Sequence, residues 1–380
     1  MAPARTLVRR TRIPVGVTAA LLSILAAAVA VSPAGAAPRQ LDAPTAVLAG
    51  QGAPVLGFGD RVLPATPAAA ASAAPGARAS TRTYRTGDGA SIQVDLSEAY
   101  RDGPATRARV QRDFIDLLGS RLHGAELSRL KMLIAPPAEV RARCGGGSGV
   151  LACYSPQTER MIVPGEAPGG FSDAVVGYAI THEYGHHIAA NRDNSPFGAI
   201  NWGTKRWSSY VKVCDGVQDG RFAPGDQGSR YLDNPGEGFA DSYAHLAYPN
   251  ATFQYNPAMA PTPGSLAALR RDVVRPWRQP VVRVVRGTAG PGRTFATSIP
   301  LRLDGELSAE LSGPPNANLD VRMTNPRGQV RRTTAAGSRD RLTVSVCRRG
   351  AAATQTESRS LRVIRVSGSG PFTLRISWPG

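Results

Sequence analysis

Hydrophobic and polar positions follow two different patterns along the chain. Up to about residue 277 the period changes repeatedly between the two-residue repeat of a strand and the 3.6-residue repeat of a helix. From this pattern we expect strands at 91–96 and 132–134, a hairpin from 151–154 and 160–163, and helices at 105–118, 172–191, 235–246 and 265–274. The mixture predicts an α+β domain over residues 83–277.

Beyond residue 280 the pattern is that of strands alone. Apolar side chains alternate with polar ones at 319–324, 342–347 and 372–378, and glycine-containing turns separate these segments. Short alternating strands at this spacing are typical of an antiparallel sandwich. We therefore expect an all-β antiparallel sandwich domain over residues 278–380.

The first 36 residues have the three parts of a secretory signal peptide. Four arginines fall within the first twelve residues, an apolar run covers residues 15–31, and Ala34-Gly35-Ala36 offers small residues for cleavage. An uncleaved membrane anchor is the alternative, but the run is short for a bilayer span. We expect a secreted, extracellular protein with no transmembrane segment in its mature form. Residues 37–82, rich in alanine and proline, are expected to be a linker or a short pro-segment.

The chain is strongly basic, with a formal charge of +17, which the loss of the four signal-peptide arginines would lower by four to +13. Only three of its basic residues are lysines. Nucleic-acid binding is one interpretation of such a charge. The arginines are scattered along strands rather than clustered with aromatic residues, so we expect no specific nucleic-acid partner. Contact with anionic cell walls remains compatible with the charge.

Four cysteines are present, an even number in a chain predicted to be exported, and two disulfides are expected. Cys144 and Cys153 flank a glycine-rich loop, where a local bridge is plausible. That pairing leaves Cys214 for Cys347, a bridge that would join the two domains.

The most informative segment is Thr181-His182-Glu183-Tyr184-Gly185-His186-His187, which contains the pattern H-E-x-x-H. Residues four apart lie on one face of a helix, so His182 and His186 can point ring nitrogens at one Zn²⁺ ion. Glu183 can reach a water on that ion, whose pKa zinc lowers to about 7, and act as general base. In another type of zinc site a third histidine follows six residues after the second. That type is excluded here, because position 192 is Arg192.

A third ligand is expected from the segment Asn234-Pro235-Gly236-Glu237-Gly238-Phe239-Ala240-Asp241. Glu237 and Asp241 are again four apart. Glu237 can bind zinc, and Asp241 can accept a hydrogen bond from the far nitrogen of a ligand histidine. A solvated acidic helix face is the alternative, which the upstream H-E-x-x-H disfavours.

H-E-x-x-H followed by E-x-x-x-D on a later helix resembles the gluzincin branch of secreted bacterial zinc metallopeptidases. The resemblance is close over the two helices and loose over residues 83–277. It implies His182, His186 and Glu237 as ligands, Glu183 as base and Asp241 behind the ligands. It also implies an upstream edge strand that aligns the substrate backbone, best matched by residues 152–154, with Ala152 and Tyr154 as its contact residues.

Two features depart from many gluzincins. The distance from His186 to Glu237 is long, so an insertion of about 194–233 must lie between the helices. A donor for the tetrahedral oxyanion is not evident. Tyr231, Tyr243 and His245 are candidates, and Tyr231 is preferred because it lies just before the glutamate helix.

The C-terminal domain resembles the pre-peptidase C-terminal type of β-sandwich, most clearly over residues 368–374. We therefore expect a monomeric zinc metallopeptidase that hydrolyses protein or peptide substrates. The alternative is a surface- or cell-wall-binding protein whose zinc domain is auxiliary or inactive.

Overall fold

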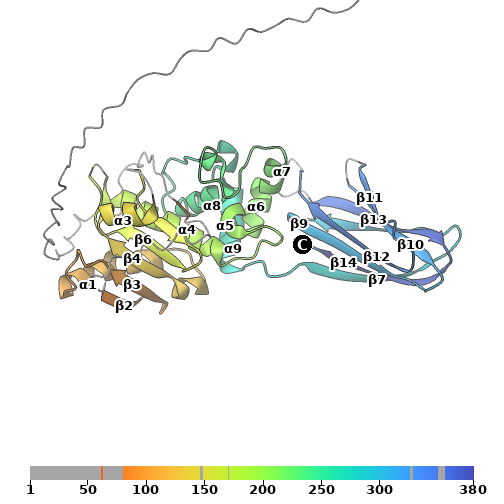
Figure 1. Cartoon of the computed structure of the whole chain (residues 1–380), viewed down its shortest axis with the longest axis horizontal. Coiled ribbons are helices and arrows are strands. Elements are labelled where there is room, and N and C mark those ends of the chain that lie inside the picture. Colours follow the sequence, from red (N-terminus) through yellow and green to blue (C-terminus); the bar gives the residue numbers. More distant parts are fainter. Residues whose placement is uncertain (1–60, 63–79, 146–148, 170, 326–327, 350–355) are drawn as a thin grey trace, which may run out of the picture. The chain divides into compact units, whose positions relative to one another are not determined.

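The computed structural model describes residues 61–62, 80–145, 149–169, 171–325, 328–349 and 356–380. The predicted signal peptide lies outside the described residues, as does most of the predicted linker or pro-segment. A mixed α/β region is followed by antiparallel sheets, as the sequence pattern predicts (Figure 1). Within the described ranges, every helix is too short or too polar to cross a membrane.

A six-stranded sheet forms the first part of the mixed region. Its strands are β1 (Arg61–Val62), β2 (Ser80–Arg85), β3 (Ser91–Leu96), β4 (Lys131–Ala135), β5 (Cys153–Ser155) and β6 (Arg160–Pro164). They lie in the order β1-β5-β6-β4-β3-β2. The neighbours β3, β4 and β6 run parallel, whereas β2 and β5 run antiparallel to β3 and β6. The predicted strands and hairpin are therefore observed, and β1 and β2 are added to them.

Helices occupy the segments between and after these strands. They are α1 (Pro104–Val110), α2 (Asp116–Gly119), α3 (Pro137–Cys144), α4 (Asp173–Ala190), α5 (Ala199–Trp202), α6 (Lys205–Val211), α7 (Val213–Gln218), α8 (Pro235–Ala244) and α9 (Pro263–Val274). A π-helical turn over Gln111–Ile115 joins α1 to α2, so the helix predicted at 105–118 is continuous but widened. The insertion between α4 and α8 contains three short α-helices and a 3-10 turn over Tyr231–Asp233.

Two hydrophobic clusters hold the described part of this region together, and the smaller of them lies between α3 and the sheet. Side chains of the sheet, of α4 and of α8 share a single hydrophobic cluster. From Val175 to Ala189 every residue of α4 is buried. A helix buried on all sides has no polar face, which explains why the segment around the H-E-x-x-H pattern is otherwise rich in alanine, valine and isoleucine.

The C-terminal region is a sandwich of two four-stranded antiparallel sheets. Its strands are β7 (Val281–Ala289), β8 (Phe295–Leu301), β9 (Gly305–Ser312), β10 (Asn318–Thr324), β11 (Val330–Arg332), β12 (Arg339–Val346), β13 (Glu357–Ser367) and β14 (Gly370–Trp378). One sheet has the order β11-β10-β13-β8 and the other β12-β9-β14-β7. Alternate residues of both sheets form a separate core, as the two-residue repeat predicts.

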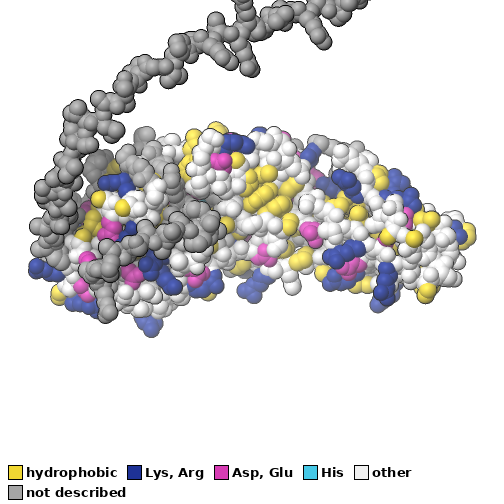
Figure 2. Space-filling view, viewed as in Figure 1, with side chains coloured by type: hydrophobic (Ala, Val, Ile, Leu, Met, Phe, Trp, Pro, Cys, Tyr) yellow, Lys and Arg dark blue, Asp and Glu magenta, His cyan; other side chains and the backbone are white. Residues whose placement is uncertain are grey.

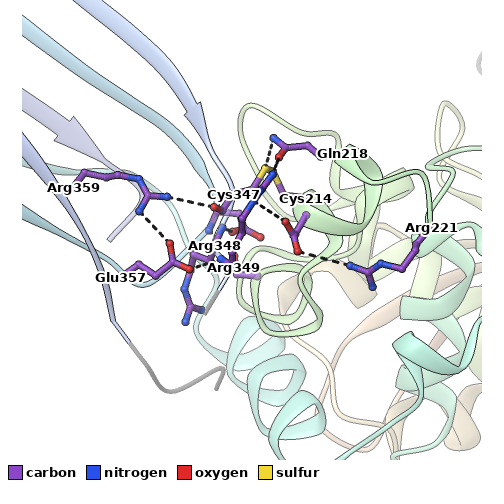
Figure 3. The surroundings of a disulfide bond; sticks show 11 residues. Cys214, Gln218, Arg221, Cys347, Arg348, Arg349, Glu357 and Arg359 are labelled. Carbon is purple, nitrogen blue, oxygen red and sulfur yellow. Dashed lines mark hydrogen bonds and ion pairs between the residues drawn. A yellow bond between two sulfur atoms is a disulfide. The ribbon is translucent and has the colours of Figure 1, made fainter. Parts of the chain in front are cut away.

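Both predicted disulfides are present. Cys144 at the end of α3 pairs with Cys153 in β5. Cys214 in α7 pairs with Cys347, the residue after β12, and so links the insertion to the sandwich (Figure 3). Beside that bridge, the Gln218 amide donates to the Cys347 sulfur, and Arg349 donates to the Gln218 carbonyl at 2.8 Å.

Basic side chains are spread over the face of the molecule shown in Figure 2 rather than gathered into one patch. Several of the arginines are neutralised by buried or half-buried carboxylates, as in the Arg192–Glu126 and Arg206–Asp272 pairs at 2.9 and 2.7 Å. The charge is therefore distributed, in line with the scattering of arginines along the sequence.

Candidate metal centre

Helix α4 supplies His182, Glu183 and His186. The two imidazoles are one turn apart on the same helix face, with their ring centroids 5.0 Å from each other. All three side chains are fully buried. Burying two imidazoles and a carboxylate in one place is costly unless they are paired or bind a metal, so this part of α4 requires a partner.

Helix α8 supplies that partner, Glu237. Asn234 caps the helix by accepting a hydrogen bond from the Gly236 amide at 3.0 Å, and Pro235 occupies its first turn. Glu237 then falls in the first turn of α8. The Asn-Pro-Gly sequence therefore starts the helix and places Glu237 in its first turn.

A close approach of the two helices brings these side chains together. Gly185, between the two histidines, lies directly against Ala240 of α8. A Cβ atom placed on Gly185 would be 2.8 Å from the Ala240 Cα and 3.1 Å from its carbonyl oxygen. Since backbone atoms cannot yield as a side chain does, only glycine permits this separation of α4 and α8.

The three candidate ligands converge on a small volume. Glu237 Oε2 is 3.1 Å from His186 Nε2 and 3.3 Å from His182 Nε2. The three ligand atoms all lie within 4.8 Å of one another. In a tetrahedral zinc site with bonds of about 2.0–2.1 Å, two ligand atoms are about 3.3 Å apart. The observed separations therefore fit a zinc ion, and the donor set of two imidazoles and one carboxylate suits it.

The electrostatics favour the protonation states that metal ligands need. Burial opposes ionisation of Glu237, but the two imidazoles outweigh it and hold the pKa of the carboxyl well below its ordinary value. Burial lowers the pKa of His186, against the opposing effect of Glu237. An ionised carboxylate and a neutral imidazole are the forms that bind a metal.

Behind the ligands, Asp241 occupies a different position from the one expected. Its Oδ1 is 3.7 Å from His182 Nδ1, too far for a hydrogen bond. The same oxygen accepts a hydrogen bond from the Tyr178 hydroxyl instead. Among the residues that the structure describes, His186 Nδ1 has no hydrogen-bond partner. The negative charge of Asp241 therefore lies near the His182 ring, while its hydrogen bond from Tyr178 joins α8 to α4.

The insertion and the segment after α8 cover the carboxylate of Glu237. The Gln227 amide donates to Glu237 Oε1 at 3.2 Å, and the Tyr231 hydroxyl donates to Oε2 at 3.1 Å. The Tyr255 hydroxyl is 3.2 Å from that of Tyr231, and the Tyr255 ring stacks on His182 with centroids 6.2 Å apart. Of these residues only Tyr231 was predicted from the sequence.

The other two oxyanion candidates are engaged elsewhere. The Tyr243 hydroxyl donates to the carbonyl oxygen of Leu122 at 2.6 Å. His245 Nδ1 lies 2.8 Å from the carbonyl oxygen of Asp241, and its Nε2 lies 2.9 Å from that of Ala251. Tyr231 is therefore the candidate whose hydroxyl lies beside the ligand cluster.

The expected edge strand is found with a modification. Ala152 precedes β5, and Tyr154 lies within it with its side chain buried rather than open to a substrate. The Tyr154 hydroxyl is 3.0 Å from His187 Nδ1, so it fixes β5 to α4. His187 Nε2 in turn lies 2.8 Å from the Glu126 carbonyl oxygen. The outer side of β5, expected to be open, is paired with β1.

No protein-family model matches the chain, and no curated protein matches it. Among solved structures, the pre-peptidase C-terminal domain of a collagenase from Bacillus anthracis is similar, with 10% identity, 25% of this chain and 87% of that chain covered, and a TM-score of 0.21. A mitogen from Yersinia pseudotuberculosis has 14% identity, coverages of 26% and 86%, and a TM-score of 0.21. A periplasmic inhibitor of g-type lysozyme from Aeromonas hydrophila has 10% identity, coverages of 25% and 84%, and a TM-score of 0.19. A pre-peptidase C-terminal domain, the type that the last hundred residues resemble in sequence, is thus among the similar structures.

Proposed function

We propose that the chain is an exported zinc-dependent metallopeptidase that hydrolyses peptide bonds in proteins or peptides. One observation carries the proposal. Two histidines and a glutamate from two helices place three ligand atoms within 4.8 Å of one another, with Glu183 beside the first ligand on the same buried helix. Two histidine ligands with a glutamate beside the first of them are the residues that metal-dependent hydrolysis of a peptide bond requires.

His182, His186 and Glu237 would hold the ion. When bound there, zinc would supply Lewis acidity that activates a water molecule and polarises the scissile carbonyl. Glu183 lies one residue after His182 on the same buried helix and would act as the general base rather than as a ligand. It takes the proton from the attacking water and delivers it to the nitrogen of the leaving amine.

Tyr231 supports the charge that develops on the carbonyl oxygen. Its hydroxyl is the donor nearest the ligand cluster, 3.1 Å from Glu237 Oε2. A fixed donor aimed at a developing oxyanion is a common source of rate acceleration. The alternative of a surface-binding protein with an inactive zinc domain rested on the lack of such a donor in the sequence, and the position of Tyr231 favours the enzyme.

The test combines metal analysis with one substitution. The purified mature protein should contain about one zinc per chain and cleave casein or an unstructured peptide, and a chelator should remove both properties. Glu183→Gln should keep the zinc and lose about 10²–10⁴-fold in kcat. Glu310→Gln, a substitution of a half-exposed glutamate in β9 of the sandwich, is the matched control. Cleavage that survives both chelation and Glu183→Gln would refute the proposal.

A further inference from the structure

Three of the scattered arginines are neighbours on the outer face of one sandwich sheet. Val321 and Met323 of β10 point into the core, so Arg322 between them points away from it. Arg322 lies opposite Arg332 of β11 on one side and opposite Arg362 of β13 on the other. The three side chains therefore form one row across three adjacent strands, which are about 4.8 Å apart.

The charges in this arginine row repel one another, because like charges directly opposite each other on neighbouring strands destabilise a sheet. Asp320 compensates one of them, since Arg332 Nε donates to its Oδ2 at 2.8 Å. Within the described ranges, Arg322 and Arg362 have no ion pair, and the buried Arg322 Nε has no hydrogen-bond partner. Two positive charges are thus left without a counter-ion, and an anion bound to the row would supply it.

A row of hydroxyl groups runs beside the arginines. Two positions along each strand, Thr324 lies opposite Ser360, and Ser360 lies opposite Ser298 of β8. Two residues of a strand span about 6.6 Å, and each hydroxyl can both donate and accept a hydrogen bond. The face therefore offers cations in one row and uncharged polar groups in the next.

The outer face of the other sandwich sheet is arranged differently. There the row that crosses β12, β9 and β14 is Arg341, Glu310 and Arg375, so opposite charges alternate between neighbouring strands. Such an alternation stabilises a sheet. The uninterrupted arginine row is therefore not a general result of an arginine-rich composition.

We propose that the outer face of β10, β11 and β13 binds a polymer of polyol phosphate. Guanidinium groups pair with phosphate oxygens through two parallel hydrogen bonds, and the hydroxyl row is placed to bond the polyol. Nucleic acid fits less well, since base stacking needs aromatic side chains, and the described residues of this face include none. This binding site goes beyond the proposed peptidase function and does not depend on it.

Binding of labelled poly(glycerol phosphate) to the chain that begins at residue 37 tests the proposal, with a chelator present so that the result is independent of peptidase activity. Arg322→Gln/Arg362→Gln should weaken binding about tenfold or more at about 50 mM salt. It should also reduce the slope of log affinity against log salt by about 1.4, because each neutralised phosphate contributes about 0.7. The matched control, Arg341→Gln/Arg375→Gln, removes the same charge from the other sheet and should leave the slope unchanged. Equal weakening by the two pairs, or no binding by the wild type, would overturn the proposal.

The hydroxyl row gives an independent readout. Thr324→Val/Ser360→Ala should weaken binding severalfold and leave the salt slope unchanged, since no charge is lost. Unchanged affinity would overturn the assignment of the polyol to this row. Polyglutamate binding as tightly as the polymer would overturn the preference for phosphate, and tighter binding of single-stranded DNA would assign the face to nucleic acid instead.

Thermal melting without the polymer separates lost binding from lost folding. Arg322→Gln/Arg362→Gln should melt no lower than the wild type, because it removes repulsion between neighbours, and a lower melting temperature would contradict that repulsion. Arg362→Gln alone changes only an exposed side chain. It should still reduce the salt slope by about 0.7, and an unchanged slope in this variant would overturn the role of the row.

Discussion

Replacing the Tyr231 hydroxyl tests the contribution to catalysis that the proposed function assigns to it. Tyr231→Phe removes the donor that lies 3.1 Å from Glu237 Oε2 and leaves the ring in place. Losing one fixed oxyanion donor costs about 10²–10³ in kcat. In the resting site this hydroxyl already bonds to Glu237 and contacts that of Tyr255, so only the gain over those bonds accelerates the reaction. We therefore expect the lower end, a loss of about 100-fold in kcat with little change in KM.

Tyr255 should act through Tyr231. Its hydroxyl lies 3.2 Å from the Tyr231 hydroxyl and orients it. The Asn256 amide donates a hydrogen bond to the Leu232 carbonyl oxygen at 2.8 Å, which holds the segments that carry the two tyrosines together. Removing one neutral hydrogen bond costs about 0.5–1.5 kcal/mol, so Tyr255→Phe should lower kcat about 2- to 12-fold. In a chain that already carries Tyr231→Phe, the same substitution should have almost no effect on kcat.

The assay is steady-state cleavage of a quenched fluorescent peptide, with the zinc content of each variant measured beside it. Tyr243→Phe is the control, because that hydroxyl donates to Leu122 away from the ligands. It should lower stability and leave kcat unchanged. A Tyr231→Phe variant within twofold of the wild type would refute the role of Tyr231. Independent, multiplicative effects of the two tyrosines would refute the coupling.

Three further outcomes follow from the structure. Gly185→Ala should lower the melting temperature and the zinc affinity together, since overpacking against the Ala240 backbone costs about 1–3 kcal/mol; a thermal shift with and without zinc measures both, and an unchanged zinc affinity would contradict the close-approach argument. Cys214→Ser/Cys347→Ser opens a covalent link between residues 133 apart and should cost up to about 5 kcal/mol by loop entropy, seen as a lower denaturant midpoint; a midpoint equal to that of the wild type would count against it. Burial raises the pKa of Asp304 to about 7, so the folded state keeps a proton that the unfolded chain releases near pH 4, and this carboxyl makes stability fall as pH rises from about 4 to 7. Asp304→Asn should remove that part of the fall in a melting curve series, and an identical pH profile in both proteins would show that burial does not have this effect.

The sequence identifies the three side chains that the structure brings together, because the information is local. His182 and His186 are separated by one helical turn, and Glu237 follows a capping asparagine and a first-turn proline. Neither fact depends on distant parts of the chain. The same holds for the sandwich, whose inner and outer faces are set by a two-residue repeat within each strand.

The covering residues depend on tertiary structure and leave little trace in the sequence. Gln227 and Tyr255 come from loops on either side of α8, and neither belongs to a periodic pattern. The pairing of β1 with β5 is likewise invisible, because residues 61–62 lie in an alanine- and proline-rich segment without alternation. Gln227, Tyr255 and residues 61–62 can be recognised only from the residues that they contact in the folded protein.

The position of Asp241 shows how the register of two packed helices can change the contact that a sequence motif predicts for a side chain. Helices α4 and α8 meet so that Tyr178 faces Asp241 and, one turn further along α4, His182 faces Glu237. The spacing of four residues between Glu237 and Asp241 matches the spacing of four between His182 and Tyr178. Because Tyr178 already donates to Asp241 Oδ1, that oxygen lies 3.7 Å from His182 Nδ1 and does not bond to it. The E-x-x-x-D spacing therefore serves the packing of the two helices as well as the proposed metal site. Tyr178, one turn before H-E-x-x-H, determines which hydrogen bond Asp241 makes.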